Sequence, residues 1–262
     1  MAPRVFIDHI VILLPHKDVI NPPARLTNHF TISPGGRHAD GKTDNKLILF
    51  QDGSYIELIA FVDDDPQNRA GHRWGDKPLG IIDYALITRD DAASNYQSMA
   101  DRLAASAPGI RYLPPASGGR KREDGTVLQW EVTTPETVQN GQLPFFCHDV
   151  TPRALRVPAS PASTAHPSGA LGVEALAVLV PGGQTEALGK GYAAVLDTSA
   201  EGDETELVFV VASLHVPPGK ESLRIRVASP KGEEEQRIVD EEGLLLTHLK
   251  FGGMNIPVKW IV

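Results

Sequence analysis

One short strand pattern occurs three times in this chain, and the repetition limits its possible folds more than any other feature. The three copies cover residues 5–15, 80–87 and 172–181. Each copy is a β-branched, apolar run around one acidic residue at an equivalent position, which is Asp8, Asp83 or Glu174. Three such runs, each opening a segment of similar layout, indicate a duplicated structural unit.

Each run is followed by a helix and further strands. In the second unit, Asp90 and Asp91 can cap a helix, and an apolar stripe at helical spacing follows them at Tyr96, Met99, Ala100 and Leu103. We predict further helices over residues 24–30 and 185–196, and a Gly-rich loop over residues 33–42. The predicted strands cover residues 46–50, 54–62, 127–133, 143–150, 206–212, 222–229 and 244–251.

The segment 151–170 is rich in Pro, Ser and Ala, which is typical of a linker. We therefore divide the chain into paired βαβββ units that form a cup (1–150), a linker (151–170) and a third related unit (171–262). The predicted fold class is α+β, with curved mixed sheets and outer helices. Ala175 stands in the third unit where His9 stands in the first, so we expect this unit to be structural. It pairs with the body, extends the sheet, or forms a subunit contact that would make a homodimer.

Composition limits the partners. The formal net charge is −8, and the positive charges are scattered, which argues against nucleic acid or an anionic membrane as the main partner. The single Cys147 leaves no intramolecular disulfide and is compatible with a reducing compartment. No apolar stretch approaches the ~20 residues of a membrane helix, and the first residues lack a signal-peptide pattern. We expect a cytoplasmic protein with a small-molecule ligand.

Residues 36–43 match the phosphate-binding loop pattern of nucleotide hydrolases in full. That loop works only when a helix begins directly after the Lys-Thr pair, so that its N-terminus faces the phosphates. Here Lys42 and Thr43 are followed by residues 46–50, which we expect to form a strand. We therefore expect no bound nucleotide.

Three polar side chains stand inside apolar strands. His9 and Glu57 lie in the first unit, and His148 occupies in the second unit roughly the place of Glu57. A buried carboxylate is costly unless it is paired, hydrogen-bonded or bound to a metal. By strand alternation, His9 shares its face with Val11, and Asp8 points the other way. These residues are the candidates for a functional site.

Several motifs, in this order and spacing, resemble the glyoxalase-like domain family of the vicinal oxygen chelate superfamily. The matching stretches are residues 7–11, 34–38, 43–47, 55–58, 143–146 and 166–170. Proteins of that superfamily pair two βαβββ units into a cup, and their metal ligands come from the first and last strand of each unit. The resemblance therefore implies a cup with a site at its centre.

Carried over position by position, the ligand positions here are His9, Glu57, Tyr84 and His148. Tyr84 departs from the usual ligand type, so the resemblance implies a triad of His9, Glu57 and His148 for Zn, Ni, Mn or Fe. In this interpretation His38 is an acid or base at the mouth of the cup. The expected substrate-binding residues are Tyr84, Trp74, Arg37 and His166.

Three interpretations stay open at this point. The first is a metal-dependent lyase, isomerase or dioxygenase. The second is a metal-free cup that binds or sequesters a small oxygen-rich molecule. The third is a purely structural site, in which His9 bonds a backbone carbonyl and Glu57 pairs with Arg37 or Arg73.

Overall fold

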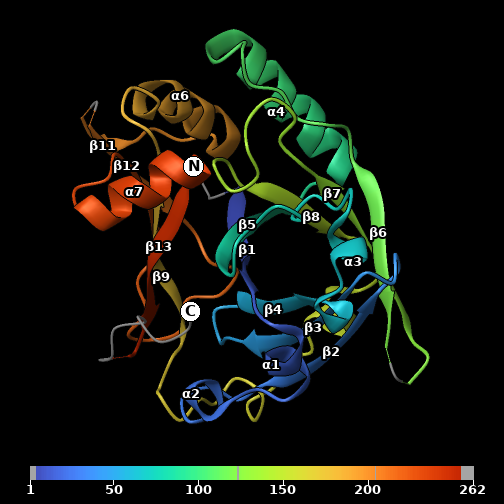
Figure 1. Cartoon of the computed structure of the whole chain (residues 1–262). Coiled ribbons are helices and arrows are strands. Elements are labelled where there is room, and N and C mark those ends of the chain that lie inside the picture. Colours follow the sequence, from blue (N-terminus) through green and yellow to red (C-terminus); the bar gives the residue numbers. More distant parts are fainter. Residues whose placement is uncertain (1–3, 123, 204, 255–262) are drawn as a thin grey trace.

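A closed eight-stranded barrel forms the body of the molecule. The computed structural model describes residues 4–122, 124–203 and 205–254, and Figure 1 shows the barrel beside a second sheet. The strand order around the barrel is β1-β4-β3-β2-β6-β7-β8-β5. The strands are β1 (Val5–Leu13), β2 (Ser33–His38), β3 (Thr43–Leu49), β4 (Tyr55–Phe61), β5 (Gly80–Thr88), β6 (Ala116–Lys121), β7 (Val127–Thr133) and β8 (Phe145–Asp149).

The barrel consists of two similar halves. In the first half β1 pairs in parallel with β4, and in the second half β5 pairs in parallel with β8. The halves join along β1 and β5, which are antiparallel from Val5 opposite Thr88 to Leu13 opposite Gly80. The second junction, between β2 and β6, is much shorter. This arrangement is the pair of repeated units that the sequence predicts.

The third repeated run opens a separate five-stranded sheet in the order β10-β11-β12-β9-β13. Its strands are β9 (Gly172–Leu179), β10 (Glu201–Gly202), β11 (Glu206–Val211), β12 (Leu223–Ala228) and β13 (Leu245–Gly252). Here β9 pairs in parallel with β12, as β1 pairs with β4. Two helices, α6 (Thr185–Leu196) and α7 (Glu233–Glu242), pack against opposite faces of this sheet.

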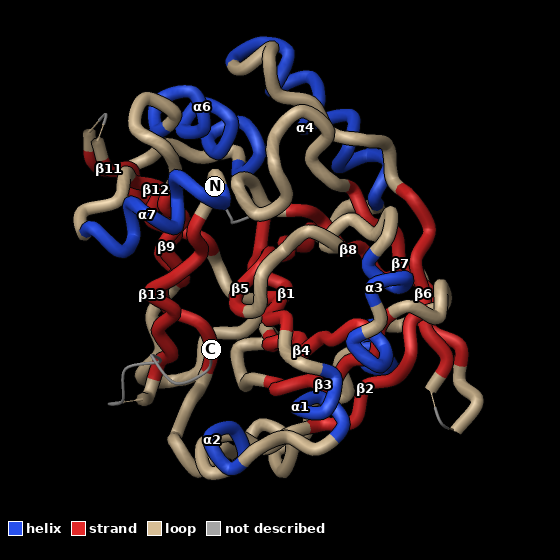
Figure 2. The backbone as a smooth tube through the Cα atoms, viewed as in Figure 1, coloured by secondary structure: helices blue, strands red, loops and turns tan. Residues whose placement is uncertain are grey.

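Helices lie outside the barrel, as Figure 2 shows. They are α1 (His16–Ile20), α2 (Ala24–Thr27), η1 (Val62–Asp64), α3 (Pro66–Arg69), α4 (Ala92–Ser106) and α5 (Arg153–Arg156). The Asp91 carboxylate accepts a hydrogen bond from the Ser94 amide at 2.9 Å, which confirms the predicted N-cap of α4. Met99 and Leu103 then bury the apolar stripe of this helix. Among the described helices, none has the length and apolarity that crossing a bilayer requires.

The largest apolar core lies between the outer wall of the barrel and the third unit. It contains Ile7, Ile10 and Leu86 from the barrel and Tyr192 and Val195 from α6. The third unit therefore covers one side of β1 and β5, while the barrel interior lies on their other side. Burial on both sides explains why these two strands are almost continuously apolar.

A buried ion pair also joins the third unit to the barrel. Lys220 Nζ lies 3.1 Å from an Asp52 carboxylate oxygen, and both side chains are almost completely buried. Ser213 donates a further hydrogen bond to Asp52 at 3.0 Å. The third unit is thus an integral part of the packed molecule.

Some elements differ from the expectation. Residues 33–38 form strand β2 rather than a loop, and β6 and α7 were not predicted. The strands β2 and β6 are rich in Gly and polar residues, so their composition gives little β signal. Thr43 opens β3 directly, so residues 36–43 form the end of β2, a hairpin turn at residues 39–42 and the first residue of β3 rather than the loop before a helix.

Candidate functional site

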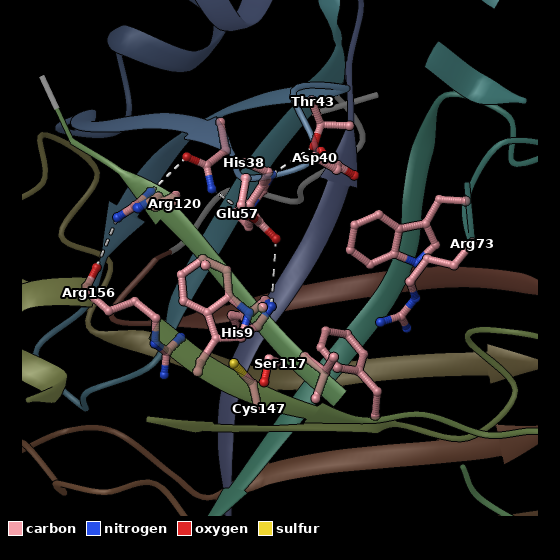
Figure 3. A pocket seen from close by; sticks show the side chains of 18 of the residues that line it. His9, His38, Asp40, Thr43, Glu57, Arg73, Ser117, Arg120, Cys147 and Arg156 are labelled. Carbon is pink, nitrogen blue, oxygen red and sulfur yellow. Dashed lines mark hydrogen bonds and ion pairs between the residues drawn. The ribbon is translucent and has the colours of Figure 1, made fainter. Parts of the chain in front are cut away.

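A cavity of about 280 Å³ occupies the inside of the barrel (Figure 3). The first half of the barrel lines it with polar side chains, among them His9, His38, Asn45 and Glu57. The second half and the preceding loop line it with larger apolar groups, among them Trp74, Trp130, Val132, Phe145 and Cys147. Polar groups of the first half and large apolar groups of the second half therefore face one cavity.

A β-bulge in β1 shapes the polar side. Ile7 pairs with Leu86 and His9 pairs with Ala85, so Asp8 has no partner of its own across the β1–β5 junction. The bulge brings the Asp8 carboxylate to within 2.7 Å of His9 Nδ1. The prediction that Asp8 points away from His9 was wrong, because regular alternation does not hold at a bulge.

Two arginines of α5 hold Asp8 in its charged form. Asp8 is completely buried and contacts Arg153, while Arg156 Nη1 lies 3.0 Å from its carboxylate. Burial alone would raise the pKa of Asp8, but the positive charges of Arg153 and Arg156 outweigh it and hold the pKa well below its usual value. An ionised Asp8 holds the proton of His9 on Nδ1. The other ring nitrogen, Nε2, then carries the free lone pair and faces the cavity.

Glu57 lies opposite that nitrogen. One of its oxygens is 3.7 Å from His9 Nε2, and the other is 3.5 Å from His38 Nε2. Asn45 donates a hydrogen bond to Glu57 at 2.5 Å. Burial would raise the pKa of Glu57, but His38, His9, the Asn45 hydrogen bond and Arg120 together lower it. Glu57 is thus a buried, ionised carboxylate between two imidazoles.

Asn45 connects this carboxylate to a buried arginine. Its side-chain oxygen accepts hydrogen bonds from Arg120 Nη1 at 2.7 Å and from the Gly36 amide at 3.0 Å. A side chain at Gly35 would collide with Asn45, since a Cβ there would lie 2.1 Å from its side-chain oxygen. The Gly-rich β2 strand therefore permits the close approach that orients Asn45 toward Glu57.

His38 completes the polar side. Its Nδ1 lies 2.7 Å from the Thr43 hydroxyl, and its ring meets Trp130 edge to face at 6.0 Å. Burial lowers the pKa of His38, which outweighs the opposing effect of Glu57. The imidazole is therefore neutral at neutral pH and can give or accept one hydrogen bond at Nε2.

These groups allow two kinds of chemistry. The open Nε2 of His9, oriented by Asp8 behind it, can accept a proton from a bound molecule. Glu57 at 3.7 Å can stabilise the imidazolium that forms, or accept a hydrogen bond from a ligand hydroxyl. Both roles need a ligand with oxygen functions next to His9 and Glu57.

Comparison with known families decides the classification. The model of the glyoxalase-like domain matches residues 7–196. The chain belongs to the glyoxalase-like domain family. The predicted family and fold class are therefore confirmed, and the matched region includes the barrel together with β9 and α6 of the third unit.

Solved structures show the same fold as this glyoxalase-like chain. A hypothetical protein from Staphylococcus aureus is similar over 87% of both chains, with a TM-score of 0.61 and 14% identity. A mutant of 4-hydroxymandelate synthase from Streptomyces coelicolor is similar over 95% of this chain and 71% of that chain, with a TM-score of 0.56 and 13% identity. At such identities the likeness is one of fold alone, of the vicinal oxygen chelate type. A comparison with curated proteins gave no match.

Four of the residues predicted for a glyoxalase-like site lie together. His9, Glu57, His38 and Trp74 all line the cavity. His148 does not, because its neighbour Cys147 points into the cavity and alternation sends His148 to the outer face of the barrel wall, where it is buried. There His148 Nε2 lies 2.9 Å from the Thr88 hydroxyl. The predicted triad of His9, Glu57 and His148 was therefore wrong.

Tyr84 was also placed wrongly. Ala85, not Tyr84, lies opposite His9 across the β1–β5 junction. Tyr84 is completely buried in the core under the third unit, where its hydroxyl bonds to that of Tyr192. The strand repeat in the sequence aligned Tyr84 with His9, one residue away from the true register.

Arg37 and His166 lie outside the cavity as well. The Arg37 guanidinium binds Asp44 at 2.9 and 2.8 Å on the barrel surface. His166 bonds the Leu49 carbonyl at 2.9 Å and accepts from the Thr31 amide at 3.1 Å, so it anchors the segment 151–170 to the barrel. Neither residue contacts the space that a ligand would fill.

The donor set does not fit the predicted metal centre. In the part of the chain that the structure describes, no three His, Cys, Asp or Glu side chains are placed to hold a metal ion together. The inner positions of the second half are Ala85 and Cys147, and burial raises the pKa of the Cys147 thiol to about 12.

Sequence reasoning did not assign five residues to the site: Asp8, Asn45, Arg73, Arg120 and Arg156. Asp8 was seen next to His9, but nothing in the sequence signals the bulge that joins them. Arg73 was considered as a partner of Glu57, whereas it pairs with Asp83 at 2.6 Å. Only the closed barrel brings Arg120 of β6 toward Asn45 of β3.

Proposed function

We propose that this glyoxalase-like protein binds a small, oxygen-bearing organic molecule inside the barrel, without the metal triad expected from the sequence. The observation that carries the proposal is the His9–Glu57 pair, which faces a cavity of about 280 Å³. This volume is close to the lower end of the roughly 300–1,000 Å³ that is typical of small-molecule sites. The ligand is accordingly a small organic molecule.

The distances within the pair favour a binding site over a purely structural one. His9 Nε2 and Glu57 are 3.7 Å apart, and His38 Nε2 and Glu57 are 3.5 Å apart. Hydrogen bonds between nitrogen and oxygen are normally 2.7–3.2 Å long. These polar atoms therefore do not satisfy one another fully, and a ligand hydroxyl or carbonyl between them would complete their hydrogen bonds.

The mixed lining supports the same proposal. Ligand sites are mostly apolar, with a few polar groups that fix orientation. Here Trp74, Trp130 and Phe145 line the same cavity as His9 and Glu57, and Phe145 meets the His9 ring edge to face at 5.4 Å. Such apolar groups exclude water and strengthen the polar contacts that a ligand makes with His9 and Glu57.

Two variants of one strand test this proposal. Val132 lines the cavity, whereas Val127 of the same strand β7 is 58% exposed on the surface. A library of small oxygen-bearing compounds is screened by thermal shift and by ligand-observed NMR. We expect compounds that bind the wild type to lose binding in Val132→Phe and to keep it in Val127→Phe.

Two results would contradict the proposal. One is a library in which no compound binds the wild type. The other is binding that Val132→Phe leaves unchanged, since the ligands would then occupy another part of the molecule. Circular dichroism of both variants checks that each has kept its fold.

A further inference from the structure

We infer that the ligand is an organic acid whose anionic group binds Arg73. This inference rests on the proposed function and specifies the chemical class of the ligand. Arg73 lies in the loop between the two barrel halves and lines the cavity, across from Arg120 in Figure 3. No role for Arg73 beyond a partner of Glu57 was expected from the sequence.

The structure holds the Arg73 guanidinium in one orientation. Its Nη2 donates a hydrogen bond to Asp83 at 2.6 Å. Its guanidinium carbon lies 4.6 Å from the Trp74 ring centre and 4.3 Å from that of Phe145. Asp83 also accepts a hydrogen bond from Trp74 Nε1 at 2.8 Å, so one carboxylate orients both side chains. A guanidinium fixed in this way is pre-organised for binding.

The Arg73 guanidinium has N–H donors without an acceptor among the described residues. Among the described residues, Nη2 is its only guanidinium nitrogen with a hydrogen-bond acceptor, and the buried Nε has none. Nη1 likewise meets no acceptor in the described part of the chain. A guanidinium has five N–H donors, and unmet donors away from bulk water are costly. The Arg73 side chain is 24% exposed, so an acidic group of a ligand in the cavity would reach the donors of Nη1 and form a charge-assisted hydrogen bond.

The distribution of charge around the cavity also favours an anion. Arg73, Arg120 and Arg156 line the cavity, and among the described residues the acids that line it are the buried Glu57 and the exposed Asp40. The carboxylates that pair with Arg73 and Arg156 stand behind them rather than at the cavity surface; they are Asp83 for Arg73, and Asp8 and Asp149 for Arg156. The inner surface near Arg73 is therefore positive.

The neighbouring wall defines the body of the ligand. Trp74 and Phe145 flank Arg73, and Trp130 and Val132 continue the apolar surface. A flat or apolar body would lie against these groups while its acidic group meets Arg73. His9 and Glu57, on the polar side, are placed to bind a second oxygen function of the same molecule.

Matched pairs of probes test the inference. Each pair is an acid and its uncharged amide of the same shape, namely benzoate with benzamide and phenylacetate with phenylacetamide. Affinity is measured by quenching of tryptophan fluorescence and confirmed by ligand-observed NMR. We expect the acid of a pair to bind about 10- to 100-fold more tightly, the range for a hydrogen bond to a charged group.

Variants of Arg73 separate the acid contact from the cavity itself. Arg73→Gln should remove the preference for the acid and leave the weaker binding of the amide. This change leaves the buried Asp83 without its charged partner. The double variant Arg73→Met with Asp83→Asn therefore removes both charges and protects the fold. Arg73→Lys should restore part of the preference.

The outcomes are distinct from those of the proposed function. The inference is overturned if acid and amide bind equally, if neither binds, or if the preference survives in the Arg73 variants. If neutral compounds still bind in a way that Val132→Phe abolishes, the proposed function stands and only the ligand class is wrong. Should both Arg73 variants fail to fold, the ratio of acid to amide affinity in the wild type decides.

Discussion

The two halves of the barrel share one architecture but present different chemistry to the same cavity. His9 lies opposite Tyr55 in the first half, and Ala85 lies opposite Phe145 in the second. By this register His9 corresponds to Ala85, and Glu57, two residues beyond Tyr55, corresponds to Cys147. The first half thus places an imidazole and a carboxylate at positions where the second half places a methyl group and a protonated thiol.

This difference shows which features of a repeated unit recur in both halves and which do not. The pairing of strands and the burial of their outer faces recur in both halves, because they depend on apolar side chains in general. The polar site depends on single residues and on the Asp8 bulge, which has no equivalent at Tyr84. A repeat therefore predicts the cup, while the chemistry inside it must be established position by position.

The largest expected effect concerns the buried charges behind the polar half. Arg156 contacts Asp8 at 3.0 Å and Asp149 at 2.5 Å, and its side chain is 4% exposed. Replacing it in Arg156→Met leaves two buried carboxylates short of their partner, which typically costs about 3–5 kcal/mol. Urea unfolding should show this loss in the free energy of unfolding.

Arg37→Met is the matched control, since Arg37 also pairs with an acid of the first half but its side chain is 54% exposed. The loss of its surface pair with Asp44 should cost less than about 1 kcal/mol. Equal losses in the two variants would show that the charges behind His9 contribute no more than an ordinary surface pair. The stability of the first half would then not depend on the buried ion pairs behind it.

The second prediction gives the apolar half the side chains of the polar half. Ala85→His combined with Cys147→Glu places donors at the positions that correspond to His9 and Glu57. We expect the double variant to gain affinity for Zn²⁺ or Ni²⁺ by at least about tenfold over the wild type, because four donors would then surround one cavity. Metal content after dialysis and thermal stabilisation by metal measure the gain.

The control is the same double variant with His9→Ala, which should lose the added affinity. If the double variant folds, binds no more metal than the wild type and is not stabilised by metal, then the two halves do not converge on a common point. The correspondence between His9 and Ala85 would then hold for the backbone only.

Much of this fold can be predicted from the sequence. The runs at β1, β5 and β9 are buried on both faces, so their apolar character is continuous and easily recognised. The helices α4 and α6 have an apolar stripe. The strands β2 and β6 were not predicted, because glycine has a low strand propensity. Glycine is needed there because a side chain at Gly35 would collide with Asn45, and one at Gly118 would collide with Trp130.

The site was only half predictable. His9, His38 and Glu57 stand out as polar groups in or beside apolar strands, and all three line the cavity. His148 gives the same signal but lies on the outer face of the barrel wall, where its Nε2 hydrogen-bonds the Thr88 hydroxyl. A buried polar side chain in a strand indicates a partner, and the sequence does not show on which face that partner lies.

The smallest expected effect is a pH dependence to which both halves contribute. Burial lowers the pKa of His38 inside the first half and of His148 outside the second. In the unfolded chain a histidine titrates near pH ~6.5, so the unfolded state binds more protons once the pH falls below that value. The free energy of unfolding should therefore fall as the pH drops from about 6.5 toward the folded pKa values.

His38→Gln and His148→Gln should each flatten this acid limb, measured by urea unfolding at a series of pH values between about 5 and 8. The two side chains lie on opposite surfaces of the barrel wall and share no partner, so their effects should add in the double variant. A double variant with the slope of either single variant would mean that the two histidines titrate as one coupled group. The inner and outer surfaces of the barrel would then be linked electrostatically, and the two halves could no longer be treated as independent.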